Sequence, residues 1–201
     1  LLAFGGIGGI AVGFAAKDLL ANFFGGLMIY LDRPFSVGDW VRSPDKEIEG
    51  TVEDVGWRLT RIRTFDKRPL YIPNAVFANI SVENPSRMTN RRIYETIGVR
   101  YSDLSVMATI IDQVTEMLLQ HEDIDSQQTM IVNFNQFSAS SLDFFIYTFT
   151  KTTRWVEFHQ IKQDVLLQVA AVIEANGAEI AFPTSTVHLE APPEALPLKG
   201  Q

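Results

Sequence analysis

The residues whose types and spacing stand out lie within the first seventeen positions, a stretch that holds a single charge. Small residues recur there at steps of three and four, which places them on one helical face: Gly6, Gly9, Gly13 and Ala16. Bulky residues recur at the same period on a second face that ends in a cation: Ile7, Ile10, Phe14 and Lys17. Neither face carries a nucleophile, a general base or a metal ligand. Their chemistry is that of close helix packing and of an apolar surface ending in a positive charge.

A helix this rich in glycine is unfavourable in water, where each glycine costs about 1 kcal/mol relative to alanine. In lipid, small residues instead allow close helix–helix contact. If several copies packed around an axis through the small face, the bulky face would line a pore with hydrophobic constrictions. A single membrane anchor and a buried core helix remain alternatives on composition alone. Because the uncharged run is shorter than the roughly 20 residues that span a bilayer, and the chain opens without methionine, we expect the helix to begin before residue 1.

The sequence holds no set of residues that could form an active site or a metal site. It has no cysteine, and its histidines, His121, His159 and His188, lie far apart without partners at metal-ligand spacing. The glycines of residues 5–9 lack the Gly-Lys-Ser/Thr ending of a phosphate-binding loop. Residues 138–141 lack the flanking glycines of a nucleophile elbow and indicate a hairpin turn. We therefore predict that the chain is not an enzyme and has no catalytic residue, metal or cofactor.

Charge is distributed unevenly along the chain, whose formal net charge is -7. Residues 101–201 hold 4 Lys and Arg against 13 Asp and Glu, which argues against a nucleic-acid-binding surface. Basic residues instead cluster just after the apolar helix, at Arg33, Arg42, Arg58, Arg61 and Arg63. By the positive-inside tendency, this cluster predicts that the residues after about position 32 lie in the cytoplasm.

Lys17 and Asp18 interrupt the apolar run, and we expect the helix to leave the hydrocarbon and to bend at this hinge. Apolar residues still recur at helical spacing beyond the hinge, with Asn22, Gly25 and Gly26 between them. This pattern predicts an amphipathic half-helix that lies toward the membrane interface. The helix should end at the next proline, because proline disfavours helical backbone in the residue before it, in the run Asp32-Arg33-Pro34.

After Pro34 the apolar residues no longer recur at helical spacing. Five short β-branched or aromatic runs are divided by turn residues, and they predict strands at 39–42, 50–56, 59–65, 69–73 and 79–83. Five strands in some sixty residues suggest a small barrel-like β-domain over residues 35–90. The Pro73-Asn74 pair is interpreted as a turn before the last strand.

A second folded region is predicted over residues 91–190. The patterns indicate a strand at 92–100, a helix at 103–120, strands at 129–135 and 141–150, a helix at 154–176 and a strand at 186–190. Ser102 or Asp103 could cap the first helix, and Gly177 is placed to end the second. The order βαββαβ is that of a ferredoxin-like α/β fold. Residues 191–201 are rich in proline and predict a tail without packed structure.

Several segments of the sequence, in order, resemble the small-conductance mechanosensitive channel (MscS) family. They are GIAVGFAAKDLLANFFGGLMIYLDRPFSVGDWV, GTVEDVGWRLTRIRTFDKRPLYIPNAVF, and ISVEN followed by RR and IGVRYSD. The resemblance covers nearly the whole chain and looks closest to low-conductance bacterial members with extra transmembrane helices. It implies a kinked pore helix over residues 1–34, an Sm-like β-domain, and a ferredoxin-like domain that helps to enclose a cytoplasmic chamber.

The resemblance also implies a function and a set of site residues. Ile10 and Phe14 match the family's pair of bulky gate residues, and Lys17 would be a polar residue near the pore exit. Phe14 replaces the more usual aliphatic residue, and its ring should narrow the pore. The family's pore helix bends near a small residue, whereas this chain has Lys17 and Asp18 there. The resemblance thus implies a tension-gated channel, a homoheptamer of a bacterial inner membrane that would contact lipids and pass ions and small solutes during hypoosmotic shock.

Two other functions compete with the channel. A membrane-anchored ligand sensor could use the ferredoxin-like domain to bind a metabolite, although an anchor would not need a glycine face. An Sm-like domain could bind RNA through residues such as Arg58 and Arg61, but acidic residues lie between its arginines and no exposed aromatic platform is evident in the sequence.

Overall fold

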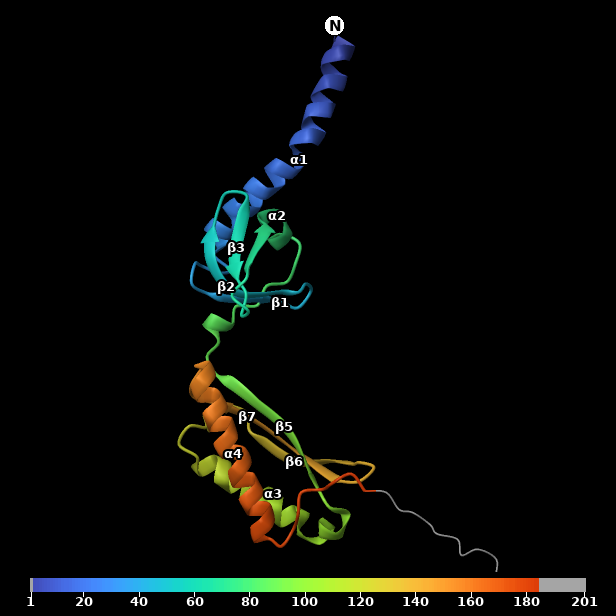
Figure 1. Ribbon diagram of the computed structural model, residues 1–201, viewed down its shortest axis with the longest axis vertical. Helices are drawn as coiled ribbons and strands as arrows, with labels where there is room; N and C mark the ends of the chain where they lie inside the picture. The colour runs from blue at the N-terminus through green and yellow to red at the C-terminus, as the bar shows by residue number, and fades with distance from the viewer. Residues whose placement is uncertain (1, 185–201) are drawn as a thin grey trace, which may run out of the picture. The chain divides into compact units, whose positions relative to one another are not determined.

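The computed structural model describes residues 2–184, and it describes residue surroundings at Gly9 and from Val12 onward. Its first element is one long helix, α1 (Leu2–Asp32). The chain divides into two units, Leu1–Met88 and Thr89–Gln201. Figure 1 shows that α1 projects away from the strands of its unit over its first half and lies beside them over its second. The helix is continuous through the Lys17-Asp18 pair. A bend at this pair remains a prediction, because an unbroken helix can still curve.

The end of α1 agrees with the sequence-based prediction. Arg33 has a left-handed backbone conformation (φ 48°), and its N–H donates to the carbonyl of Ile29 at 3.0 Å. Pro34 follows and cannot continue the helix. By length and composition, the segment Val12–Asp32 could cross a membrane.

A meander of four antiparallel strands follows α1 in the first unit, in the order β1-β2-β3-β4. The elements are β1 (Trp40–Ser43), β2 (Ile48–Val55), β3 (Leu59–Arg63), β4 (Pro69–Pro73), the short helix α2 (Asn74–Phe77) and the 3-10 turn η1 (Pro85–Arg87). The buried side chains come from alternate strand positions and from the end of α1: Ile29, Phe35, Val41, Val52, Ile62 and Ile72. The second half of α1 therefore shares a core with the sheet.

The predicted fifth strand at 79–83 is wrong. In this segment only Glu83 pairs with a strand, through a single bridge to Arg42. The backbone N–H of Ser81 donates to the Asp45 carboxylate at 2.6 Å, so it is satisfied by a side chain instead of a neighbouring strand. Asn74, predicted to lie in a turn, begins α2 instead. Among residues 2–184 the first sheet does not close into a barrel.

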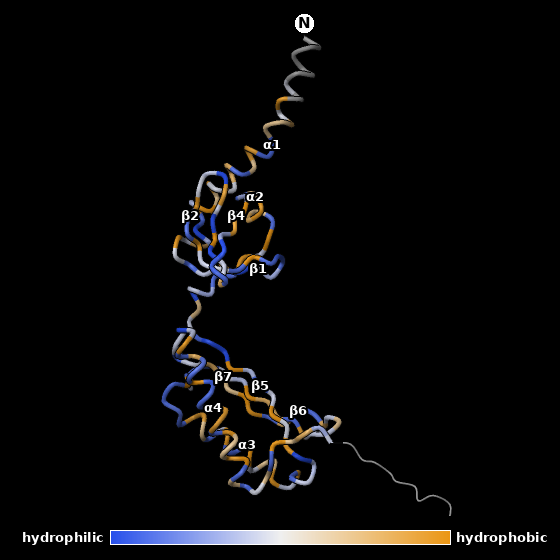
Figure 2. Tube along the Cα trace, viewed as in Figure 1, coloured by the Kyte–Doolittle hydropathy of each residue, from blue (hydrophilic) through white to orange (hydrophobic). Residues whose placement is uncertain are grey.

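The second unit is a three-stranded antiparallel sheet with two helices. Its elements are β5 (Arg91–Val99), the 3-10 turn η2 (Tyr101–Val106), α3 (Met107–Gln120), β6 (Ile131–Phe137), β7 (Leu142–Thr150) and α4 (Trp155–Ala175). The strand order is β5-β7-β6. Figure 2 shows hydrophobic segments concentrated in the strands and on the two helices. One face of the sheet packs against both helices around a core that includes Ile93, Ile110, Phe144, Ile146 and Val165.

Local details of this unit confirm one predicted helix end and correct one predicted cap. Gly177 has φ 70° and follows the last turn of α4, and Ala178 donates to Ile173 at 3.1 Å. Asp103 does not cap α3, because its carboxylate accepts from the Arg100 side chain at 2.9 Å and from Glu179 N–H at 3.0 Å. The described order is βαββα, and the predicted strand at 186–190 lies outside the described residues.

Candidate functional site

The predicted pore residues lie on the part of α1 that projects from its unit. A Cβ placed on Gly9 or Gly13 would meet no atom within 4 Å. The Phe14 side chain is 74% exposed, and Lys17 is also exposed. The predicted positions Gly6 and Ile10 lie where the structure describes no side-chain surroundings. Within one chain, the described residues of the small face and of the bulky face are therefore open rather than packed against one another.

The second half of α1 has the opposite surroundings. A Cβ on Gly25 would lie 2.6 Å from the carbonyl oxygen of Asn74, and a Cβ on Gly26 would lie 2.7 Å from the Asn74 side-chain nitrogen. The helix thus approaches α2 so closely that only glycine fits at these two positions without a shift of the backbone. The sequence-based prediction treated this pair as part of an amphipathic half-helix and did not identify the contact.

Asn74 is fully buried, and its side chain joins α2 to β3 and to the turn between β2 and β3 by hydrogen bonds. Its Oδ1 accepts from Thr60 Oγ1 at 2.8 Å, and its Nδ2 donates to the carbonyl of Gly56 at 2.8 Å. The next backbone N–H, at Ala75, donates to Oδ1 of Asn22 on α1 at 3.0 Å. A buried amide with both ends satisfied fixes α2 against the sheet, and the bond from Ala75 to Asn22 ties α1 to α2. The sequence-based prediction did not identify the contact made by Asn22 or that made by Asn74. The signals available were the polar Asn22 between apolar helical positions and the Pro73-Asn74 pair.

A second set of contacts holds the segment that leaves α1. The Asp39 carboxylate accepts from the Ser36 N–H at 3.0 Å and from the Asn84 side-chain amide at 2.9 Å. The same amide nitrogen donates to the carbonyl of Pro34 at 3.1 Å. The hydrogen bond from Asn84, followed by the Ser36 N–H and the charge of Arg87, lowers the pKa of Asp39 below its ordinary value. The backbone just beyond α1 is therefore clamped to the β-domain.

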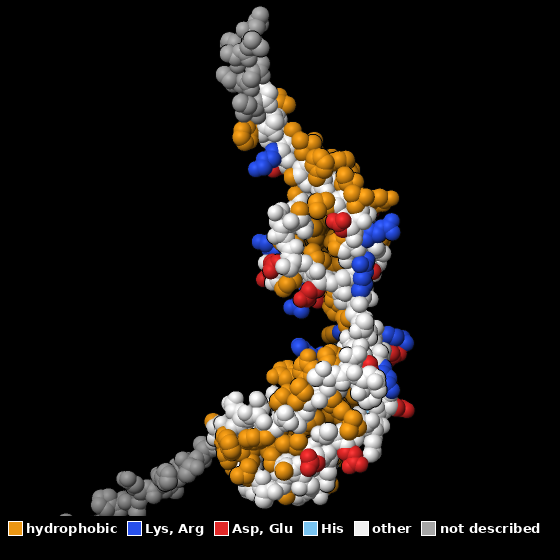
Figure 3. Space-filling model, turned by 180° about the vertical axis from the view of Figure 1, so that it is seen from behind, with side chains coloured by type: hydrophobic (Ala, Val, Ile, Leu, Met, Phe, Trp, Pro, Cys, Tyr) orange, Lys and Arg blue, Asp and Glu red, His pale blue; other side chains and the backbone are white. Residues whose placement is uncertain are grey.

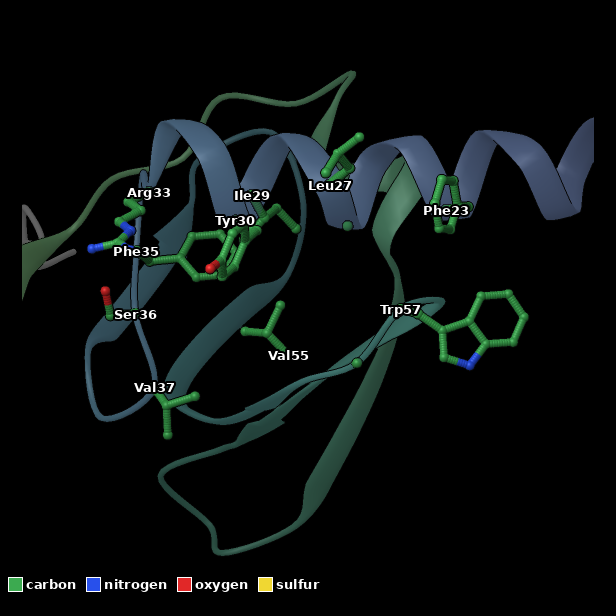
Figure 4. Close-up of a pocket in the computed structure, with 12 residues that line it drawn as sticks. Phe23, Leu27, Ile29, Tyr30, Arg33, Phe35, Ser36, Val37, Val55 and Trp57 are labelled. Carbon is green, nitrogen blue, oxygen red and sulfur yellow. The ribbon is translucent and has the colours of Figure 1, made fainter.

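A cavity of about 440 Å³ lies between the end of α1 and the strands. Figure 4 shows Phe23 and Trp57 toward one end of it and Arg33 toward the other. The lining is mainly apolar, and the Arg33 guanidinium lies 5.9 Å from the centre of the Tyr30 ring. We call the second half of α1 the docked half. It contacts Asn74, and the segment after Pro34 is bonded to the β-domain, whereas the cavity separates the helix from the sheet between these two points.

From Val12 to Leu31, α1 displays many exposed apolar side chains, some of which line the cavity. Figure 3 shows these side chains along the helix, with a cation beside them. The exposed large apolar residues are Val12, Phe14, Leu19, Leu20, Phe23, Phe24, Leu27, Met28, Tyr30 and Leu31. A surface of this extent is typical of contact with lipid or with other protein segments.

The described residues outside α1 include no grouping of three or more His, Cys, Asp or Glu that could hold a metal ion. Sequence reasoning assigned no close carboxylate to His121, and this was incomplete, because its Nε2 lies 3.0 Å from Asp164 Oδ2. Its Nδ1 accepts from the Asp123 N–H at 3.2 Å, so both ring nitrogens have structural partners. The serine-rich segment is the β6–β7 turn, closed by the Ser138 N–H to the Ser141 carbonyl at 2.8 Å.

Comparison with known protein families accounts for most of the chain. Residues 18–87 match the family described as "Mechanosensitive ion channel, beta-domain" and residues 96–180 match "Mechanosensitive ion channel MscS, C-terminal". The chain belongs to the MscS family. The first match includes the second half of α1 together with the sheet on which it packs.

Curated relatives support the same assignment. This MscS-family chain is 57% identical over 196 residues to the "Low conductance mechanosensitive channel YnaI" of Escherichia coli, with 96% of the chain and 57% of that protein covered. It is 33% identical over 190 residues to the "Small-conductance mechanosensitive channel MscMJ" of Methanocaldococcus jannaschii, with 94% of the chain and 53% of that protein covered. The chain spans about half the length of the curated relatives it matches. Their names describe channels, which supports at a coarse level the prediction that the chain is not an enzyme.

Solved structures match across nearly the whole MscS-family chain. Arabidopsis thaliana MSL1 gives a TM-score of 0.84 at 28% identity, covering 91% of this chain and 65% of that one. Helicobacter pylori MscS in its closed state gives 0.78 at 28% identity, covering 95% and 73%. The fold is therefore that of the MscS family, with an apolar N-terminal helix followed by β-rich domains.

Proposed function

We propose that this chain supplies the pore helix and cytoplasmic domains of a channel opened by membrane tension, which releases ions and small solutes during hypoosmotic shock. The observation that carries the proposal is the difference between the two halves of α1. The first half, which we call the open half, has a glycine face and projects from its unit, whereas the docked half packs against the β-domain. A soluble protein would bury the apolar surface of the first half, whereas a membrane protein can leave it to lipid and to neighbouring copies.

The assembly that this function requires is a ring of identical chains. A single helix cannot enclose a pore, so several copies must place their first halves around one axis, with a homoheptamer expected from the family resemblance. Gly6, Gly9, Gly13 and Ala16 would form the contact between neighbouring helices. We place the assembly in a bacterial inner membrane as a multi-pass protein, with the residues after about 32 in the cytoplasm.

Permeation would be controlled by the bulky face of the same half. Ile10 and Phe14 would form the narrowest apolar rings, where a closed pore excludes water. Lys17 would line the passage just below them, and the Lys17-Asp18 pair would act as the hinge between the two halves. Membrane tension would favour the state that occupies more membrane area and would thereby shift a two-state equilibrium.

The docked half would limit what can move during this transition. Because Gly25 and Gly26 contact Asn74, the end of α1 and the β-domain should move as one body. Motion would then concentrate in the open half, where Gly9 and Gly13, the glycines whose surroundings the structure describes there, have no such contacts within the chain. The Sm-like and ferredoxin-like descriptions of the two domains, and their role in enclosing a chamber through which ions pass, belong to the same proposal.

The competing functions have less support. Relatives named as channels favour the channel over a membrane-anchored ligand sensor. The acidic second half of the chain argues against RNA as a partner.

The test is a patch-clamp recording of the full-length protein reconstituted alone in liposomes under stepped suction. Small stepwise currents above a threshold of tension are expected. Silence at tensions close to membrane rupture, with assembly verified, would refute the proposal and favour the ligand sensor.

The gate can be tested by truncating Phe14. Phe14→Ala should raise the unitary conductance by removing the bulk of one ring per chain from the constriction. Val12→Ala is the matched control, because Val12 is also an exposed apolar residue (69%) but points to another face of α1. Equal conductance for Phe14→Ala and the wild type would remove Phe14 from the gate.

A further inference from the structure

A histidine closes the loop that follows α3 in the second unit. His121 comes directly after the last turn of α3, and its side chain is 6% exposed. Its Nε2 lies 3.0 Å from Oδ2 of Asp164 on α4, and its Nδ1 lies 3.2 Å from the backbone nitrogen of Asp123. We refer to residues 121–125 as the α3 loop and to these two contacts of His121 as the latch.

The latch requires a neutral imidazole ring. A backbone N–H can only donate a hydrogen bond, so Nδ1 must accept the bond from Asp123 with a lone pair. The single ring proton is then on Nε2, which donates to the Asp164 carboxylate. A second proton, on Nδ1, would set two N–H donors against each other. Protonation of the ring therefore breaks the bond to Asp123 and leaves the contact with Asp164.

The surroundings of the ring are able to stabilise the protonated form. The charged groups that face His121 or lie beside it come from α4, the α3 loop, α3 and the end of β7: Asp164, Glu122, Asp123, Glu116 and Lys151. Glu157 of α4 lines a neighbouring cavity together with Asp123 and Asp164. The one cation in this set, Lys151, is bonded to the Glu122 carbonyl at 2.5 Å. The carboxyl end of a helix also favours a positive charge.

The ring is accessible to protons although it is largely covered. A cavity of about 350 Å³ lies beside it, and His121, Glu122, Asp123 and Asp164 contribute to its lining. The Asp164 side chain is 57% exposed, so its carboxylate joins the ring to solvent. Histidine ordinarily changes its charge between about pH 5 and pH 8. The latch is thus built from a group that can titrate under conditions in which the fold persists.

The α3 loop also holds parts of the second unit that are distant in sequence. The Asp125 N–H donates to the carbonyl of Phe149 on β7 at 2.8 Å, and the buried Ile124 forms a bridge with Thr150. The Asp125 carboxylate accepts from the side-chain amide of Asn90 at 2.9 Å. Asn90 directly precedes β5. A change in the α3 loop is therefore felt at the end of β7 and at the start of β5.

We infer that His121 is a pH-sensitive latch on the α3 loop. At neutral pH the uncharged ring holds the backbone of Asp123 and keeps the loop closed. When the pH falls, the protonated ring keeps Asp164 and releases the Asp123 N–H, so the loop opens more often. The latch goes beyond the proposed function and does not depend on it. With residues after about 32 in the cytoplasm, as proposed, it would respond to cytoplasmic acidification.

The test is hydrogen exchange of the full-length protein in detergent, measured by mass spectrometry in peptides that span residues 119–126. Rates are corrected for the intrinsic pH dependence of amide exchange. Protection should fall about tenfold between about pH 7.5 and about pH 5.5, because a hydrogen bond of the closed loop is lost. Peptides around the buried Val165 and Val169 of α4 should keep their protection. Equal protection of residues 119–126 at the two pH values would overturn the inference.

Substitution of the histidine assigns the effect. His121→Gln keeps a neutral polar side chain and removes the titrating ring, so protection of the α3 loop should no longer change with pH. His159→Gln is the matched control, because His159 is exposed and its ring packs on that of Trp155 at 4.4 Å. This control should keep the wild-type difference. A pH dependence that persists in His121→Gln, or that disappears in His159→Gln, would contradict the latch.

A second variant leaves His121 in place and tests its charge. Asp164→Asn removes the carboxylate that stabilises the protonated ring, so the loss of protection should require a lower pH than in the wild type. A merely structural contact would not move this pH profile. The variant also decides the case if His121→Gln lowers protection throughout α3 and α4. A profile identical to that of the wild type would reject the latch.

These outcomes separate the latch from the channel, because hydrogen exchange requires no current. Tension-gated currents from a protein whose α3 loop ignores pH would reject the latch and leave the proposed function intact. A pH-dependent loop in a protein that never conducts would reject the proposed function and leave the latch.

Discussion

The two halves of α1 contain the same kinds of residue in opposite surroundings. Gly9 and Gly13 face open space, whereas Gly25 and Gly26 are pressed against the backbone and side chain of Asn74. Both pairs stand among bulky apolar residues at helical spacing. Contacts within this chain explain why glycine is needed at positions 25 and 26, but a Cβ at position 9 or 13 would contact no atom within 4 Å. Glycine among bulky apolar residues of one helix can thus serve a contact inside the chain or a contact that another chain must supply.

This difference also divides the helix mechanically. The docked half is held by Asn74, by Asn22 and by the clamp at Asp39. The open half is held by none of these groups. Substitutions in the docked half should therefore remove contacts that stabilise a single chain. Substitutions in the open half should change the stability of a single chain only through helix propensity, and their effect on contacts should appear in the assembled protein.

The largest effect is expected at Asn74. Asn74→Ala should lower the free energy of unfolding by about 3 kcal/mol, because it leaves Thr60 and Gly56 without their buried hydrogen-bond partner. The measurement is denaturant unfolding of the purified chain in detergent. Asn79→Ala is the control, since this exposed amide donates to Ala75 only, and its effect should stay within about 0.5 kcal/mol. Similar losses for the two variants would show that the junction does not depend on the buried amide.

A pair of alanine substitutions tests the comparison directly. Gly25→Ala should cost about 2 kcal/mol, because its Cβ would overlap the Asn74 carbonyl and force the helix away from α2. Gly13→Ala should instead stabilise the dissociated chain by up to about 1 kcal/mol, through helix propensity alone. In the assembled channel the order should change, with Gly13→Ala altering gating at the contact between helices. Equal effects of the two substitutions on the dissociated chain would break the distinction between the halves.

The smallest effect concerns pH. Hydrogen bonds from Asn84 and Ser36 lower the pKa of Asp39, so its charged form stabilises the folded state at neutral pH. This contribution is fully present above the ordinary carboxyl pKa and is lost as the pH falls through the lowered pKa. Asp39→Asn should therefore reduce the acid-induced loss of stability below about pH 4 by less than about 1 kcal/mol. Unfolding curves at pH 6 and pH 3 provide the comparison, and parallel losses in the two proteins would rule out this role of Asp39.

Local patterns were sufficient for several features. The period-two runs located β1–β4 and β5–β7, and the proline and glycine signals placed the ends of α1 and α4. The segment at 79–83 was misassigned, because its apolar residues resemble a strand while its backbone has only the bridge to Arg42 and a bond to Asp45. Whether a short apolar run becomes a strand depends on a partner at the sheet edge, and that partner is distant in sequence.

By itself, the sequence determined the apolar helix with its two faces, the absence of enzyme-like residue sets, and the alternation that specifies two β-rich regions. These features are local, since they depend on period, propensity and turn residues within about ten positions. The tertiary structure alone decided that Gly25 and Gly26 meet Asn74 and that the Tyr94 ring of β5 lies 6.0 Å from the Tyr147 ring of β7. Both arrangements bring together residues about fifty positions apart, and only chain folding sets such distances.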